Sequence, residues 1–112
     1  MIRLALCQLR TELDWNETMD KAERMVRSAA ESGADFAVLP EMFSCPYSHG
    51  YFRRALQMGH EETLSRMKAW AADNGIYLVG GSIPERNVDK LYNTCYVYDD
   101  KGRTVARHRK MH

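Results

Sequence analysis

The feature that most constrains this chain is the order of its apolar segments. Short apolar runs, each too short for a helix, alternate with longer segments whose apolar residues recur at helical spacing. The runs cover residues 2–9, 36–39 and 76–80, and the helical segments lie between them. This alternation is typical of a sheet whose first strands are parallel and are joined by helices. We therefore predict an α/β fold.

The two helical segments carry signals for their ends. Asp14 is placed to cap the first helix, with Glu17 three residues later in capping-box spacing, and Gly33 follows the last apolar position. The second helix is expected over residues 61–74, where the dipeptide NG ends it. Between the second strand and this helix, residues 45–52 read CPYSHGYF, and their Gly, Pro and polar residues predict a loop.

The last third of the chain predicts an antiparallel pair. Residues 92–98 and 104–108 are strand-like, and the segment DDKG between them suits a tight turn. The predicted sheet is thus parallel at first and mixed at its edge. A length of 112 residues suits a single domain, residues 1–112.

Composition narrows the function classes. With 45% hydrophobic and 28% charged residues, the chain has a globular balance. Its net charge of +1 provides no global field for nucleic acid or an anionic membrane, and no apolar run is long enough to cross a bilayer. Three cysteines without CxxC spacing suit reduced thiols. We therefore expect a cytoplasmic protein with neither nucleic-acid nor membrane partners.

A glutamate stands at the end of the second predicted strand. In open α/β sheets, ligands bind beyond the carboxyl ends of the strands, and Glu41 follows such an end directly after Pro40. One interpretation is an exposed loop carboxylate. The other is an acid or base whose pKa is raised by the apolar neighbours Leu39, Met42 and Phe43.

A lysine near the end of the chain is the second candidate. On a strand, His108, Lys110 and His112 share one face, while Arg107 and Arg109 share the other. Lys110 either points into the crevice that holds Glu41 or belongs to a solvated basic edge strand. The two histidines would lie about 13 Å apart on a strand, so no metal site is predicted.

Four segments together carry a family resemblance. They read LPEMF at 39–43, GGSIPE at 80–85, LYNTCYVYDDKGR at 91–103 and RHRKMH at 107–112, and they resemble the nitrilase superfamily of carbon-nitrogen hydrolases. The stretches SCPYSHGYF and GGSIPER are most similar to the omega-amidase branch. The resemblance implies a four-layer αββα sandwich, of which this chain supplies roughly the N-terminal half as one partial domain: a mixed sheet with helices on one face. One sheet face is then expected to be uncovered, which favours a homo-oligomer.

The resemblance also implies a mechanism. Members of the superfamily use a glutamate, a lysine and a cysteine, and Glu41 and Lys110 match the first two. The cysteine attacks an amide or nitrile carbon and forms a thioester, while the glutamate moves protons and the lysine stabilises the oxyanion. The implied substrate is a small amide, in the omega-amidase branch the terminal amide of a dicarboxylic acid monoamide. No metal or organic cofactor is implied.

The third member of the triad has no match. In the family the nucleophilic cysteine lies downstream of the lysine, and Cys7, Cys45 and Cys95 do not stand in that context. We therefore expect the 112-residue chain alone to be inactive. Phe43 and Tyr47 are candidates for the walls of a substrate pocket, with packing of the loop or of an interface as the alternative.

Two other classes of protein are alternatives for this order of elements. A dinucleotide-binding domain needs a glycine-rich turn after the first strand, and CQLRTELDW contains no glycine. A non-enzymatic truncated paralogue, which covers its open sheet by pairing with another chain, remains the alternative. A measurement of oligomeric mass and a thiol-dependent amidase assay distinguish it from an enzyme.

Overall fold

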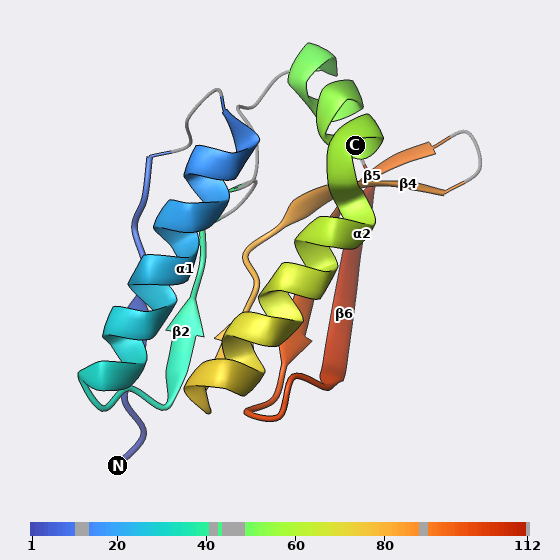
Figure 1. The fold of residues 1–112 in the computed structure, drawn as a ribbon. Coiled ribbons are helices and arrows are strands. Elements are labelled where there is room, and N and C mark those ends of the chain that lie inside the picture. The colour runs from blue at the N-terminus through green and yellow to red at the C-terminus, as the bar shows by residue number, and fades with distance from the viewer. Residues whose placement is uncertain (11–13, 41–42, 44–48, 88–89, 112) are drawn as a thin grey trace.

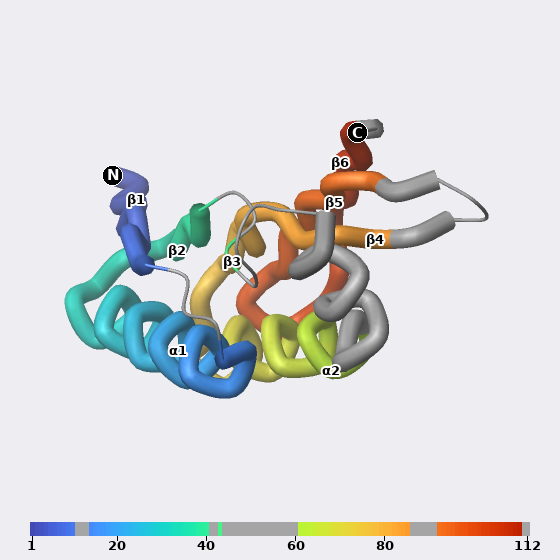
Figure 2. Tube along the Cα trace, turned by 90° about the horizontal axis from the view of Figure 1, so that it is seen from above, coloured from blue at the N-terminus to red at the C-terminus, as the bar shows by residue number. Residues whose placement is uncertain are grey.

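The fold is a mixed sheet covered on one face by two helices (Figures 1 and 2). It is seen in a computed structural model that describes residues 1–10, 14–40, 43, 49–87 and 90–111, with the backbone alone for 49–60, 86–87, 90–91 and 111. The elements in chain order are β1 (Leu4–Leu6), α1 (Trp15–Glu31), β2 (Phe36–Val38), α2 (His49–Asn74), β3 (Tyr77–Val79), β4 (Ile83–Asn87), β5 (Lys90–Tyr98) and β6 (Thr104–Met111). The predicted α/β class, with both helices on one face, is confirmed.

The sheet changes from parallel to antiparallel at β5. The first three strands pair in parallel in the order β1-β2-β3. Strand β5 is antiparallel to all its partners: β3 pairs with its end, β4 with its beginning, and β6 with its other edge. The turn between β5 and β6 contains Gly102 at φ 80°, and the N–H of this residue donates to the carbonyl of Asp99 at 3.0 Å. The predicted hairpin is thus present.

Both helices end in the same glycine motif. Asp14 caps α1 by accepting from the N–H of Asn16 at 3.1 Å. At the other end Gly33 has φ 86°, and the N–H groups of Gly33 and Ala34 donate to the carbonyls of Ala30 and Ala29, both at 3.0 Å. These two nested bonds form a Schellman motif, which satisfies carbonyls of the last turn of the helix.

The structure differs from the prediction at the start of α2 and at β4. Helix α2 begins at His49 instead of residue 61, so the last part of the predicted loop CPYSHGYF is helical. Gly59 is the one glycine inside residues 51–60, and a single interior glycine costs only about 1 kcal/mol, which does not end a helix. Strand β4 was not predicted, because IPERN is polar and contains a proline, which sequence reasoning places outside strands or at their edges.

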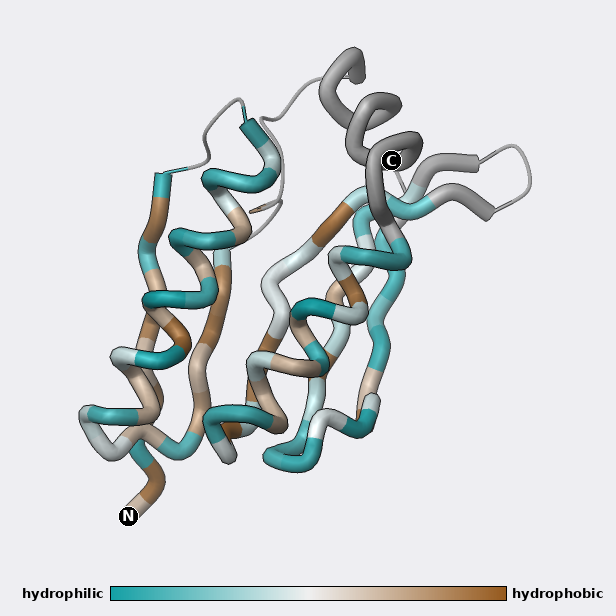
Figure 3. The backbone as a smooth tube through the Cα atoms, viewed as in Figure 1, coloured by the Kyte–Doolittle hydropathy of each residue, from teal (hydrophilic) through white to brown (hydrophobic). Residues whose placement is uncertain are grey.

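The core lies between the helices and the sheet. Met19 and Val26 of α1, and Met67 and Trp70 of α2, are almost fully buried, as is Leu78 of β3. Within the described residues no helix covers the other face of the sheet, and large apolar side chains remain open to solvent there: the exposed fractions are 63% for Leu4, 69% for Leu6 and 37% for Tyr77. Figure 3 shows that the first strands contain strongly hydrophobic segments, drawn in brown. An uncovered apolar sheet face is therefore present in the described chain.

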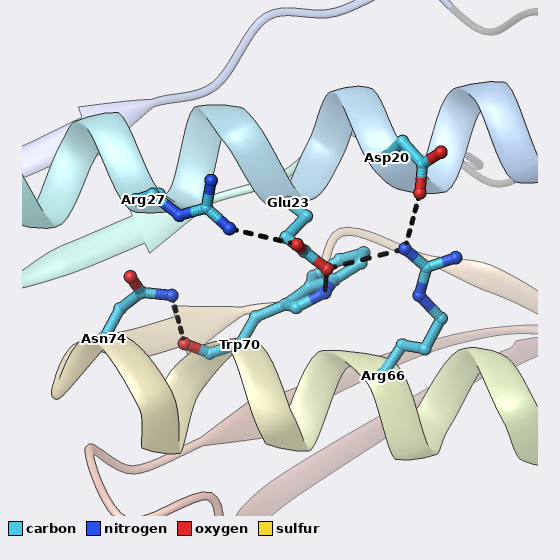
Figure 4. A network of polar contacts seen from close by, with 6 residues as sticks. All are labelled: Asp20, Glu23, Arg27, Arg66, Trp70 and Asn74. Carbon is cyan, nitrogen blue, oxygen red and sulfur yellow. Dashed lines mark hydrogen bonds and ion pairs between the residues drawn. The ribbon is translucent and has the colours of Figure 1, made fainter.

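A polar network joins the two helices on their outer side (Figure 4). Glu23 of α1 accepts from the indole N–H of Trp70 at 2.9 Å, and Arg66 pairs with both Asp20, at 2.9 Å, and Glu23, at 3.5 Å. The guanidinium of Arg66 also lies 5.7 Å from the ring centroids of Trp15 and Trp70. These contacts fix the helices as one layer over the sheet.

Candidate active site

Backbone hydrogen bonds continue past the ends of the parallel strands and hold the residues that follow these strands next to one another. The N–H of Cys7 donates to the carbonyl of Val38, and that of Leu39 donates to Val79, both at 2.9 Å. On the next strand the N–H of Gly80 donates to Tyr96 at 2.8 Å. Leu39 and Gly80 therefore lie side by side, at the edge of the sheet where α/β proteins bind their ligands.

Gly81 brings the backbone of the next segment against the end of β2. It has φ 62°, a left-handed conformation that favours glycine. A Cβ on this residue would lie 2.1 Å from the carbonyl oxygen of Pro40 and 2.8 Å from that of Leu39, which is far inside van der Waals contact. Only glycine allows this approach to the peptide that directly precedes Glu41.

Gly81 also lines a cavity of about 300 Å³ on the helix-free face of the sheet. The register explains its composition: Asn93 of β5 is directly opposite Lys110 of β6. The next pair on the same face is Cys95 and His108. The cavity is lined by Gly81, Ser82, Asn93, Cys95, His108 and Lys110.

The thiol in this cavity is poorly suited to nucleophilic attack. Burial raises the pKa of the Cys95 thiol above its ordinary value. Burial likewise raises the pKa of Cys7, partly offset by a hydrogen bond with the backbone of Val38. Because the thiolate is the nucleophile, both cysteines are disfavoured for that role at neutral pH.

The structure describes only some of the site residues that the sequence predicted. Lys110 lies in the cavity, on the opposite face of β6 from Arg109, as the alternation predicted. Glu41, Cys45 and Tyr47 lie outside the described residues. The proposal that Glu41 and Lys110 act together therefore stays a prediction.

Phe43 is described, and its environment favours one of its two interpretations. The ring is fully buried and belongs to the hydrophobic core together with Leu39 and Met67. This burial favours packing, and its role as a wall of a substrate pocket stays a prediction.

Sequence reasoning missed most of the cavity. Ser82, Asn93 and Cys95 drew no functional interpretation, although Asn93 and Cys95 alternate on β5 just as His108 and Lys110 alternate on β6. The available signal was the DDKG turn, which fixes how the two strands pair. In the described residues there is no group of three or more histidine, cysteine or acidic residues placed to hold a metal ion.

Comparison with known proteins identifies the class to which this fold and cavity belong. The profile of the carbon-nitrogen hydrolase family matches residues 3–112, so the chain belongs to that family. Among curated proteins it is similar to the omega-amidase NIT2 of Mus musculus, with 40% identity over 110 residues, which is 98% of this chain and 40% of the mouse protein. The chain thus spans less than half the length of this relative.

Solved structures agree on the fold. The Nit3 protein of Saccharomyces cerevisiae, a member of branch 10 of the nitrilase superfamily, matches with a TM-score of 0.88 and 31% identity over 99% of this chain and 44% of its own. An amidase from Nesterenkonia sp. matches with a TM-score of 0.87 and 27% identity over 97% of this chain and 42% of its own. The nitrilase fold predicted from the four segments is confirmed.

No helix among the described residues has the length and apolar character needed to cross a membrane.

Proposed function

We propose that this chain provides the glutamate and the lysine of an amidase that hydrolyses small amides, with omega-amidase-like preference for the monoamide of a dicarboxylic acid. The supporting similarity is to curated omega-amidases. The observation that carries the proposal is the position of Gly81. It lines the cavity that holds Lys110 and packs against the carbonyl groups of Leu39 and Pro40, the two residues before Glu41.

In the proposed reaction the substrate amide lies beside Lys110. A cysteine thiolate attacks the amide carbon after Glu41 has taken its proton, and the ammonium of Lys110 stabilises the negative oxygen of the tetrahedral intermediate. Glu41 then protonates the leaving ammonia, which leaves a thioester. Water, deprotonated by Glu41, attacks the thioester and releases the acid and the thiol.

We further propose that the nucleophile is none of this chain's own cysteines. Cys7 is buried in the core, and burial raises the pKa of both Cys7 and Cys95. Cys45 precedes Lys110 in the sequence, whereas the resemblance implies a nucleophile downstream of the lysine. We therefore expect the 112-residue chain alone to bind amides without turning them over.

A binding experiment tests the site. Succinamate, a four-carbon dicarboxylic acid monoamide, is titrated into the ¹⁵N-labelled chain, and the backbone resonances are followed by NMR. We expect saturable shifts at Asn93, Cys95 and Lys110, and a loss of about tenfold or more in affinity for Lys110→Met, because a charge-assisted contact is removed. Lys101→Met, in the exposed turn between β5 and β6, is the matched control and should bind as the parent does. Equal affinity of both variants contradicts the proposed site.

An activity assay tests the missing nucleophile. The purified chain is checked for its mass of 13.0 kDa and incubated with succinamate, with and without iodoacetamide, while released ammonia is measured. We expect no ammonia in either reaction. Turnover that iodoacetamide abolishes would refute the inactivity, and Cys45→Ser and Cys95→Ser would then show which thiol acts.

The second candidate function is an interaction module that pairs with another copy of this chain. The uncovered sheet face favours it, because Leu4 and Leu6 of β1 and Tyr77 of β3 are exposed on that face. Light scattering after size-exclusion chromatography, over a range of concentrations, tests it. If pairing through this face is the function, the parent exceeds 13.0 kDa and Leu6→Lys restores that mass. A parent that stays at 13.0 kDa excludes self-pairing.

We propose a cytoplasmic location on the basis of the cysteines. Cys7 and Cys95, the two that the structure describes, are free thiols, which suits a reducing compartment. Cell fractionation with a tagged chain tests this location.

A further inference from the structure

A buried carboxylate lies on the opposite side of the sheet from the cavity. Glu85 of β4 is 7% exposed, and its side chain faces the helices together with Thr94 of β5. Its carboxylate accepts hydrogen bonds from the hydroxyls of Thr94, at 3.3 Å, and of Tyr96. It also forms an ion pair with Arg109 of β6, with Nη2 at 2.7 Å from Oε1. The donors come from two other strands.

This ion pair crosses a whole strand. Strand β5 lies between β4 and β6 and pairs with both. Neighbouring strands are about 4.8 Å apart, so the backbones of β4 and β6 are separated by about 10 Å, a distance that only long side chains can bridge. Glu85 and Arg109 therefore tie together two strands that share no backbone hydrogen bonds in the described sheet.

Arg109 is held on a second side as well. Its guanidinium lies 5.0 Å from the ring centroid of Tyr92, in cation–π contact. Its side chain is only 26% exposed. A partly buried cation of this kind needs its carboxylate, because removal of one partner leaves the other charge poorly solvated.

The hydroxyl of Tyr96 stays a donor over the whole physiological range. Burial, followed by the hydrogen bond to Glu85 and the charge of Glu85, raises the pKa of Tyr96 to about 12, against a smaller opposite effect of Arg107. The carboxylate of Glu85 thus keeps the hydroxyls of Thr94 and Tyr96 and the guanidinium of Arg109 as donors.

Lys110 is the next residue of β6, and its side chain points the opposite way. Thr94 is opposite Arg109 on the helix side, and Asn93 is opposite Lys110 on the cavity side. Because successive side chains alternate between the two faces of a strand, the orientation of Arg109 fixes that of Lys110. Any twist or slip of β6 that frees Arg109 also moves Lys110.

We propose that Glu85 is a positioning residue for Lys110, which acts by anchoring Arg109 so that the end of β6 keeps its register and presents Lys110 to the cavity. The importance of Lys110 itself rests on the function proposed above, whereas the anchoring does not. If Glu85 only stabilised the whole fold, its replacement would weaken every strand equally. If it is a positioning residue, its replacement loosens the end of β6 selectively.

Hydrogen exchange of backbone amides separates these two roles. We compare the protection of residues 107–110 with that of residues 77–79 in β3, in the parent chain and in Glu85→Gln. We expect a fall of about tenfold or more in protection at 107–110, the size expected for loss of a charge-assisted contact, with less than threefold change in β3. Arg109→Gln, at a less buried position, should give the same pattern.

Two further variants serve as controls. Tyr96→Phe removes one donor to Glu85 and keeps the ion pair, so protection at 107–110 should fall less than threefold. The exchanged pair Glu85→Arg with Arg109→Glu restores an ion pair across β5 and should recover most of the protection that each single charge change removes. Recovery of this kind is not expected if Glu85 only fills space.

The proposal is overturned if Glu85→Gln and Arg109→Gln lower protection equally in β3 and β6, or change neither. The succinamate titration distinguishes failure of this proposal from failure of the proposed function. If Glu85→Gln loosens residues 107–110 while the parent chain binds no succinamate, the anchoring stands and the amide site fails. If the parent binds succinamate and Glu85→Gln binds it equally well, the site stands and the positioning role fails.

Discussion

Replacement of Gly81 by alanine tests how tightly the end of β2 is packed against the cavity. At φ 62°, an alanine pays a conformational penalty of about 1–2 kcal/mol. Its Cβ would also lie 2.1 Å from the carbonyl oxygen of Pro40, so the backbone must move. Forcing a methyl group into a packed site typically adds about 1–3 kcal/mol. We therefore expect Gly81→Ala to lose about 2–5 kcal/mol of unfolding free energy, a large part of the stability of a typical domain.

Gly75 provides a matched control for this substitution. Its φ of 59° is almost the same, but a Cβ there would meet no atom within 4 Å. Gly75→Ala therefore carries the conformational penalty alone, about 1–2 kcal/mol. Both variants are unfolded in urea and followed by circular dichroism. The difference between their losses, expected to be about 1–3 kcal/mol, measures the contact with Pro40.

Equal losses for the two variants would refute this reasoning. They would mean that the backbone of Leu39 and Pro40 moves without cost, and that Gly81 is not tightly packed against it. The same variants connect stability with the site. Gly81→Ala should weaken succinamate binding under conditions where it remains folded, and Gly75→Ala, at the far end of α2, should leave it unchanged.

Two further predictions concern packing and pH. Trp70→Phe should cost about 1–2 kcal/mol in urea unfolding, because it removes the indole N–H that donates to Glu23 and leaves a smaller ring in the helix layer; an unchanged midpoint would contradict a structural role for the network. The pKa of Asp99 is lowered chiefly by the backbone N–H of Arg103, with help from that of Lys101 and from the Arg103 side chain. Its stabilising effect is therefore present above the unfolded-state pKa of about 4 and is lost as the pH falls through the lower folded-state value. Asp99→Asn should accordingly show a smaller drop in urea midpoint between neutral and acid pH than the parent, and an identical drop would contradict this assignment.

The sequence predicted those parts of the fold that depend on local signals. The helix ends at Gly33 and Gly75 follow from the need for a left-handed residue after a helix, and both have positive φ. The hairpin follows from DDKG in the same way. The start of α2 was missed because the Pro, Gly and polar residues of CPYSHGYF predicted a loop, and residues 49–60 carry no strong start signal. Strand β4 was missed because it forms only through pairing with β5.

The cavity depended on information that no local pattern carries. Lys110 was predicted from a resemblance, but Gly81 and Ser82 precede β4, Asn93 lies in β5, and these segments meet Lys110 of β6 only once the sheet has formed. The contact of Gly81 with Pro40 joins residues about forty positions apart in the chain. A glycine in a loop predicts conformational freedom, but the sequence alone does not reveal which backbone it must approach.

The two cations at the end of β6 connect the fold with the proposed chemistry. Arg109 and Lys110 are adjacent in sequence, similar in charge and opposite in direction. A slip of one residue between β5 and β6 would exchange them, placing Lys110 near Glu85 and Arg109 in the cavity. An arginine there would present a planar fork instead of a compact ammonium, so it would not replace the lysine beside an oxyanion. The turn at Asp99–Gly102 and the anchor at Glu85 hold the hairpin from its two ends against this exchange. The register of β6 is therefore as important to the proposed site as the identity of Lys110.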